Sequence, residues 1–107
     1  MKKVTLTCAH AIVKYLIAQK ILIDGKKEPL FPGVFGIFGH GNVACLGQAL
    51  EENQKDLPTY RGHHEQNMAL TGIGYSRGKR RQQIFIATSS VGPGATNMIT
   101  ASAVAMS

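Results

Sequence analysis

RGHHEQNMALTGIGYSRGKRRQQIFIATSSVGPGATN, residues 61–97, decides the fold because it holds a helix, a strand and a glycine-rich turn in one run. The pattern predicts a helix that begins near residue 63 or 64, carries Glu65 in its first turn and ends near residue 78. Residues 83–88, QIFIAT, are mostly apolar and predict a buried strand. The Gly-Pro-Gly of residues 92–94 predicts a sharp turn that opens another helix. One carboxylate is thus expected on a rigid element near loops that suit a charged or planar ligand.

The rest of the chain adds further helices and strands. Thr7 is the expected N-cap of a first helix, and residues 21–33 are expected to be a loop with a turn at Asp24-Gly25. Because the strands alternate with helices, the sheet should be mostly parallel and the fold should belong to the α/β class. The expected elements are helices over 8–20 and 43–53, strands over 34–38 and 58–60, and inward-facing Ala9, Ile12, Val13, Leu16, Ile17, Leu46 and Leu50.

Length and composition narrow the class of protein. The 107 residues suffice for one domain, and 44% hydrophobic with 17% charged residues is typical of a globular chain. No run of about 18 apolar residues occurs, so we expect no membrane partner. The two cysteines, Cys8 and Cys45, form no CxxC spacing, which favours reduced thiols in a cytoplasmic protein. Only about three strands are expected and the chain stops inside an apolar helix, so residues 1–107 should be a truncated domain.

The net charge of +6 raises the question of a nucleic-acid partner. Four of the twelve basic residues lie at the end of the helix that contains Glu65, where cations favour the helix dipole. Aromatic residues do not alternate with them, so we expect no nucleic acid, although an interaction module built on this patch stays open. The four residues are Arg77, Lys79, Arg80 and Arg81.

Glu65 allows two interpretations. It shares a helical stripe with Ala69, Gly72 and Ser76, and glycines inside a helix are easier to understand where another backbone or a ligand packs closely. A carboxylate on such a face would be partly desolvated, which would raise its pKa and suit it to sharing a proton. Alternatively, Glu65 is a first-turn acid stabilised by the helix dipole. The pattern alone favours neither.

Two glycine loops are candidates for ligand contact. Residues 39–44, GHGNVA, fit the dinucleotide fingerprint GxGxxA, but the acidic ribose partner expected about 20 residues on is missing, since Thr59, Tyr60 and Arg61 stand there. A tight turn without a ligand and a turn lining some other ligand stay open. Residues 89–97 could bind an anion or a carbonyl at a helix start, or their side chains could serve only as caps. The adjacent histidines at 63 and 64 are not expected to bind a metal together.

Taken with these motifs, HHEQNMAL and IFIATSSVGPGATNMIT resemble the pyrimidine-binding domain of thiamine-diphosphate enzymes, the group of acetolactate synthase and pyruvate oxidase. The resemblance runs from the first helix to the last residue. The loop IFGHGNVACLGQALEE is similar to a ring-opening hydrolase within that group, which cleaves a C–C bond of a cyclic dione in myo-inositol catabolism. The resemblance therefore implies the parallel-sheet, three-layer αβα fold of that pyrimidine domain. It also implies that the chain is a partial N-terminal piece of such a hydrolase. An acetolactate-synthase-like enzyme and a nucleotide-binding α/β module are the alternatives.

The resemblance also implies roles for individual residues. Glu65 corresponds to the catalytic glutamate that contacts N1′ of the aminopyrimidine and so activates the cofactor. Thiamine diphosphate and Mg²⁺ are implied for the full enzyme, with the diphosphate and metal ligands outside this chain. The partner implied is the pyrophosphate-binding domain of a second subunit in a homo-oligomer, so the chain alone should be inactive. The implied cofactor-binding residues are Glu65, Gly39, His40, Gly41, Asn42, Gly92, Pro93 and Asn97.

Overall fold

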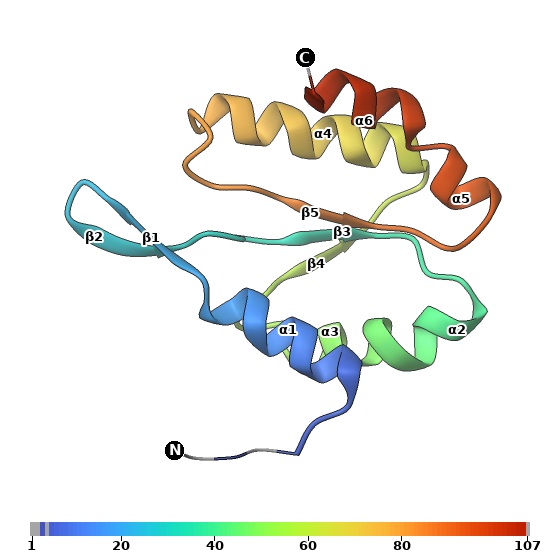
Figure 1. The fold of residues 1–107 in the computed structure, drawn as a ribbon, viewed down its shortest axis with the longest axis horizontal. Helices are drawn as coiled ribbons and strands as arrows, with labels where there is room; N and C mark the ends of the chain where they lie inside the picture. Colours follow the sequence, from blue (N-terminus) through green and yellow to red (C-terminus); the bar gives the residue numbers. More distant parts are fainter. Residues whose placement is uncertain (1–2, 4, 107) are drawn as a thin grey trace.

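Three parallel strands form a sheet with helices on both faces (Figure 1). β3 (Val34–Gly36) lies in the middle and pairs in parallel with β4 (Thr59–Arg61) and β5 (Ile86–Thr88). The computed structural model describes Lys3 and residues 5–106, and in these residues the predicted three-layer α/β architecture is confirmed. Each strand of this sheet has three residues, so β3 and β5 are shorter than the strands predicted over 34–38 and 83–88.

The lower layer consists of α1 (Cys8–Ala18) and a second helical segment, residues 40–52. Thr7 caps α1 as predicted, because its side chain accepts a hydrogen bond from the backbone N–H of His10. The second segment comprises α2 (His40–Asn42), the π-helical η1 (Val43–Gly47) and α3 (Gln48–Glu52), so it begins three residues before the predicted start. The side chains buried between this layer and the sheet form one apolar cluster: Val13, Val34, Ala49, Leu50 and Leu57.

Most of the predicted inward face of α1 is confirmed. Ala9, Leu16 and Ile17 pack against the buried cluster, and Val13 is inaccessible to solvent. Ile12 is an exception, since 47% of its surface is exposed. Helical spacing alone could not separate it from its neighbours, because the second helical segment covers a narrower strip of α1 than the apolar residues occupy.

The upper layer consists of α4 (Glu65–Gly78), α5 (Pro93–Thr96) and α6 (Ile99–Met106). His64 is the N-cap of α4, so the predicted start and end of this helix are confirmed. α4 packs on β3, on β5 and on α6. The predicted last helix is divided in two, because the segment turns between Thr96 and Ile99.

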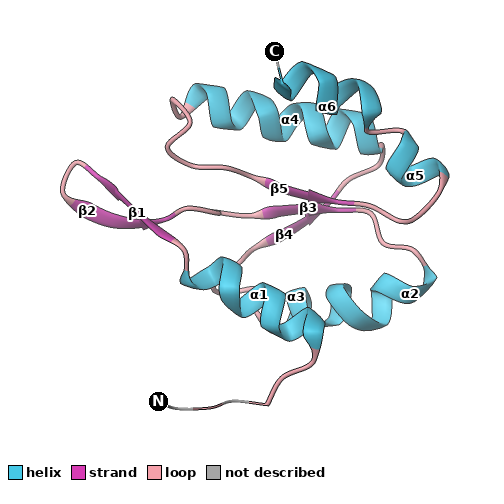
Figure 2. Ribbon diagram, viewed as in Figure 1, coloured by secondary structure: helices cyan, strands magenta, loops and turns pink. Residues whose placement is uncertain are grey.

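Residues 20–29 form a β-hairpin, and the expectation of a loop there is wrong. β1 (Lys20–Ile23) pairs antiparallel with β2 (Lys26–Pro29), away from the central sheet (Figure 2). The predicted turn at Asp24-Gly25 is confirmed, and both residues have positive φ, 51° and 80°. Two consecutive positive φ values produce the tight turn that joins antiparallel strands.

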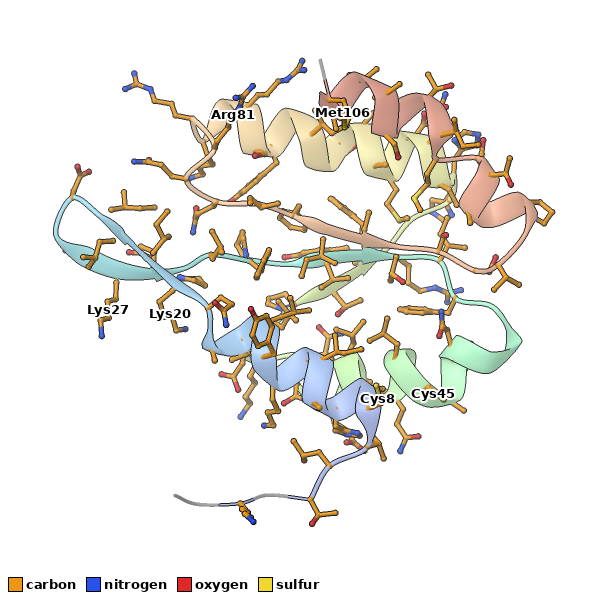
Figure 3. The ribbon with its side chains drawn as sticks, in the orientation of Figure 1. Cys8, Lys20, Lys27, Cys45, Arg81 and Met106 are labelled. Carbon is orange, nitrogen blue, oxygen red and sulfur yellow. The ribbon has the colours of Figure 1, made fainter. Side chains whose placement is uncertain are left out.

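Both cysteines are free and exposed on the lower layer, Cys8 at the start of α1 and Cys45 in η1 (Figure 3). Lys20 and Lys27 extend from the hairpin into solvent. None of the helices in the described residues has both the length and the apolar character needed to cross a membrane.

Candidate functional site

The carboxyl ends of the three strands meet at one edge of the sheet, because the strands are parallel. The chain that leaves β3 enters the lower layer through α2, whereas the chains that leave β4 and β5 enter the upper layer through α4 and α5 (Figure 1). Adjacent strands whose connections diverge in this way open a crevice outside their carboxyl ends, which is where open α/β sheets bind ligands. The predicted acid and both glycine loops lie at this edge.

Glu65 is the first residue of α4, and its side chain joins α4 to the region of α5. Its Oε1 accepts a hydrogen bond of 3.0 Å from Nδ2 of Asn97, which is the C-cap of α5. Both residues are half-buried. The structure thus brings together two predicted site residues that are far apart in the sequence.

The pKa of Glu65 lies below its ordinary value of 4.5, so the rise that a desolvated, close-packed face would cause, one of the two interpretations, does not occur in this chain. The main cause is the hydrogen bond donated by Asn97, followed by one from the backbone N–H of Glu65 itself. Partial desolvation acts in the opposite direction but is the weaker effect. Donors that favour the charged form outweigh burial here because the carboxylate stays open to solvent on one side.

Glycines allow the two loops to approach each other. A Cβ on Gly39 would lie 2.8 Å from the Cβ of Ser90, so the first loop can contact the second only because residue 39 has no side chain. A Cβ on Gly94 would lie 2.5 Å from Oγ of Ser90 and 3.2 Å from Oε2 of Glu65. Gly94 is buried, and its missing side chain leaves one edge of the carboxylate clear.

The other residues of the first loop contribute unequally. Nδ2 of Asn42 donates to the backbone oxygen of Ser89 over 3.5 Å, a long hydrogen bond. Gly41 is exposed, and a Cβ there would meet no atom within 4 Å. The side chain of His40 lies outside the described part of the structure. Gly39 and Asn42 are therefore brought to the second loop, whereas Gly41 is not. The contact with Ser90 gives a reason for glycine at position 39 that needs no pyrophosphate, which weakens the dinucleotide interpretation.

Gly92 and Pro93 shape the second loop. Gly92 has φ 64° and ψ −122°, a conformation that side chains disfavour, and it is the N-cap of α5. Pro93 is the first residue of that helix, where its missing N–H is no loss. Both are exposed, and their backbone conformations orient the helix that ends at Asn97.

His64 is a member of the site that sequence reasoning did not identify. Its Nδ1 accepts a hydrogen bond of 3.3 Å from the backbone N–H of Asn67, and its Nε2 lies 3.3 Å from Nδ2 of Asn97. Ser90, which was considered only as a cap, was missed in the same way. The sequence marks His64 only as a residue at the start of a helix, and its contact with Asn97 comes from a distant segment. Ser90 has no sequence signal of its contact with Gly39 in the distant first loop.

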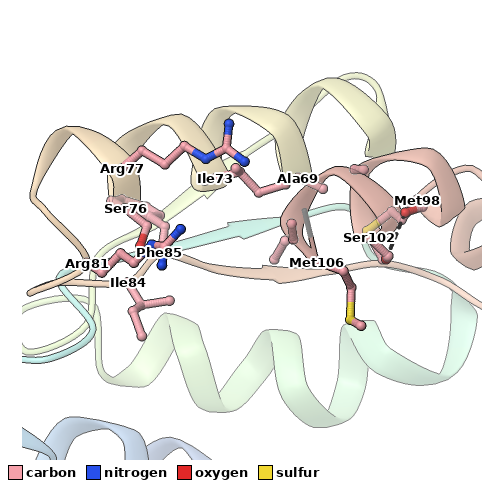
Figure 4. Close-up of a pocket in the computed structure, with 14 residues that line it drawn as sticks. Ala69, Ile73, Ser76, Arg77, Arg81, Ile84, Phe85, Met98, Ser102 and Met106 are labelled. Atoms are coloured by element: carbon pink, nitrogen blue, oxygen red, sulfur yellow. Dashed lines mark hydrogen bonds between the residues drawn. The ribbon is translucent and has the colours of Figure 1, made fainter.

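A cavity of about 590 Å³ lies between α4 and α6 rather than beside Glu65 (Figure 4). Ala69, Gly72 and Ser76 line it, so most of the predicted small-residue stripe of α4 faces this cavity. Arg77 and Arg81 lie at one end of it. Gly74 is exposed and a Cβ there would meet nothing within 4 Å, so close packing within this chain does not explain that helical glycine.

The basic patch at the end of α4 has contacts within the chain. Nη2 of Arg77 donates to the backbone oxygen of Val104 over 3.2 Å, and Nζ of Lys79 lies 5.9 Å from the centre of the Tyr75 ring. These contacts agree with a helix end that uses cations to meet its own dipole and neighbours. Within the described residues, no group of three or more His, Cys, Asp or Glu side chains could hold a metal ion.

Comparison with known proteins points in one direction. The family described as "Thiamine pyrophosphate enzyme, N-terminal TPP binding domain" matches residues 7–107. A 3D-(3,5/4)-trihydroxycyclohexane-1,2-dione hydrolase of Geobacillus thermodenitrificans is 51% identical over 105 residues, and proteins of that name from Bacillus thuringiensis and Clostridium tetani are 50% and 48% identical. Each alignment covers 98% of this chain and 16% of the relative. No solved structure matches the chain significantly.

Proposed function

We propose a function for this chain on the basis of its family. The chain belongs to the thiamine pyrophosphate enzymes and matches their N-terminal TPP binding domain over residues 7–107. Glu65 is the carboxylate that exchanges a proton with the aminopyrimidine ring of thiamine diphosphate. The observation that carries this assignment is the pair formed by Glu65 and Asn97, which holds a carboxylate at the carboxyl edge of the sheet beside a buried glycine.

The residues present fit a flat heteroaromatic ring. Oε1 of Glu65 is held by Asn97, while Oε2 lies next to Gly94, where a side chain would come within 3.2 Å of it. A ring edge needs this kind of uncovered carboxylate oxygen for a direct hydrogen bond. Gly39 lets the first loop approach Ser90, the residue whose Oγ also lies beside Gly94.

Thiamine diphosphate supplies a carbanion-type nucleophile when it is bound. This chain contributes the position and the charge of one carboxylate. The hydrogen bonds of Glu65 keep it ionised in the free chain, and a ring nitrogen that shares its proton would favour the protonated form instead. Glu65 can therefore accept and return a proton at one fixed atom, which is the task of a general acid–base.

The chain spans about 16% of the length of the curated relatives that it matches, so the activity of the whole protein is part of the proposal. We propose a C–C hydrolase that acts on a cyclic trihydroxy-dione in myo-inositol catabolism, in the cytoplasm. Mg²⁺ and the diphosphate would be bound by a pyrophosphate-binding domain outside these residues, on a partner subunit of a homo-oligomer. The 50% identity to hydrolases of that substrate class supports this choice over an acetolactate-synthase-like enzyme.

Exchange of the C2 proton of bound thiamine diphosphate with deuterium, followed by NMR in the enzyme that carries this domain, tests the assignment. Glu65→Gln should slow exchange by about 10²–10⁴-fold, the usual contribution of a general acid–base, while the fold is kept. Glu51→Gln is the matched control, since it removes an exposed carboxylate of α3. Unchanged exchange in Glu65→Gln would exclude Glu65 as the activating residue.

A further inference from the structure

A single atom of Asn97 serves two neighbours at once. Its Nδ2 lies 3.0 Å from Oε1 of Glu65 and 3.3 Å from Nε2 of His64. Whichever end of the amide occupies this place must satisfy both the carboxyl group and the imidazole. Whether a donor or an acceptor stands at this shared position therefore affects the hydrogen bonds of both Glu65 and His64.

The other nitrogen of His64 determines what Nε2 can do. Nδ1 accepts a hydrogen bond from the backbone N–H of Asn67, which is part of the cap of α4. In a neutral imidazole one nitrogen accepts and the other carries the proton, so Nε2 carries the proton and is a donor. A charged imidazole also has a proton on Nε2. The ring therefore presents a donor toward Asn97 in either state.

These two neighbours make opposite demands on Asn97. An ionised Glu65 needs a donor, which Nδ2 supplies, but Nδ2 then faces the N–H of His64. A reversed amide would place Oδ1 there and satisfy His64, but Oδ1 would then face the carboxylate oxygen. Only a protonated Glu65 resolves the conflict, because its O–H and the N–H of His64 can both donate to Oδ1.

We propose that Asn97 is a positioning residue whose amide reverses when Glu65 takes up a proton, and that the N–H of His64 favours the reversed orientation. The network then has two arrangements, one for each protonation state of Glu65. In the first, the hydrogen bond from Nδ2 lowers the pKa of Glu65. In the second, that stabilisation of the charged form is absent and an acceptor holds the acid proton.

The consequence for catalysis rests on the proposed function. A glutamate that exchanges a proton with a ring nitrogen must be held in both of its states, and a reversible amide does this without movement of the backbone. Other ionisable groups near the network are Arg61, at the end of β4, and His63, which line a cavity of about 240 Å³ together with His64. Both are exposed, so water screens their charges.

NMR of the chain labelled with ¹⁵N in histidine and asparagine tests the proposal without any cofactor. The variant Glu65→Gln replaces the acid proton by an amide N–H, so Asn97 should reverse. In this variant the Nε2 proton of His64 should exchange with water at least about 10-fold more slowly than in the parent chain, and the Asn97 side-chain amide signals should shift. Equal exchange and equal Asn97 signals in the two chains would overturn the proposal.

A second variant separates reversal from a change at residue 65. Asn97→Asp places an acceptor oxygen at the shared position whatever the state of Glu65, so the Nε2 proton should be protected while Glu65 is intact. Glu51→Gln should change neither signal. Two results from Glu65→Gln can be combined. Slow exchange of the His64 Nε2 proton in the chain, together with unchanged exchange of the C2 proton of thiamine diphosphate in the enzyme, would support this network and reject the proposed function. Fast Nε2 exchange in both variants would reject the network alone.

Discussion

The two helical layers on the sheet differ in how they are packed. The lower layer buries Val13, Leu50 and Leu57 almost completely against the sheet, and its helices share one apolar cluster with β3. The upper layer buries Met68 and Ala101 and leaves a cavity of about 590 Å³ between α4 and α6. Apart from Met68, the buried residues of α4 and α6 are small, Gly72 and Ala101, whereas the lower layer buries leucine and valine.

This difference suggests a division of roles, in which the lower layer contributes most to stability and the upper layer holds the residues of the candidate site. Burying large apolar side chains is the main favourable contribution to folding, so the lower layer and the sheet carry most of it. The upper layer holds Glu65, His64 and Asn97, and their positions depend on contacts between loops rather than on a filled core. Four substitutions test this division.

Replacing Leu50 by alanine should have the largest effect. The side chain is 2% exposed, and such deletions cost about 2–5 kcal/mol of unfolding free energy because they leave a cavity. Ile73→Ala, in the upper layer, is the matched change, and it should cost less because Ile73 already lines an open cavity. Urea denaturation followed by circular dichroism measures both. Equal losses would show that the two layers stabilise the chain alike.

Gly39→Ala should push apart the first loop, residues 39–44, and the second loop, residues 89–97. The added methyl group would lie 2.8 Å from the Cβ of Ser90, which cannot rotate away, and overpacking of this kind costs about 1–3 kcal/mol. Gly41→Ala lies on the same loop where nothing is within 4 Å, and it should be nearly neutral. Denaturation midpoints of the two variants decide the matter. A neutral Gly39→Ala would mean that the loops are not in firm contact.

Gly74→Ala should stabilise the upper layer by about 1 kcal/mol, since alanine loses less conformational entropy in a helix than glycine does. The position is in the middle of α4, exposed and free of neighbours within 4 Å. A rise of the thermal midpoint, with unchanged chemical shifts at Glu65 and Asn97, is the expected result. A loss of stability would indicate that this face of α4 packs against something in solution.

The smallest effect concerns pH. His10 and Gln48 lower the pKa of Glu52 below 4.5, mainly through the 2.5 Å contact between Oε2 of Glu52 and Nε2 of His10. A lowered carboxyl pKa stabilises the folded state fully above the unfolded pKa, and this contribution is lost as the pH falls through the folded pKa. Glu52→Gln should therefore reduce the difference in unfolding free energy between about pH 7 and about pH 3. An unchanged pH dependence would show that the contact does not tie α1 to α3.

The elements that sequence reasoning located correctly have strong local signals. α4 combines a cap, a first-turn acid and a helical run, and the Gly-Pro-Gly turn restricts its own backbone. The hairpin over 20–29 was missed because Asp24-Gly25 was identified as a turn without its flanking residues being recognised as strands. The sequence of β2, KKEP, has no apolar alternation, so it carries no periodic signal of a strand.

The sequence alone determined the α/β class, the order along the chain of the three strands of the central sheet and the position of Glu65 at the start of a helix. These features depend on periodicity, capping and glycine–proline chemistry, which act between residues close in the chain. Tertiary structure alone decided that Asn97 donates to Glu65, that His64 and Ser90 belong to the site, and that the pKa of Glu65 is lowered rather than raised. A pKa depends on which donors and how much water surround a carboxylate, and those neighbours come from distant segments that meet only after the sheet has formed.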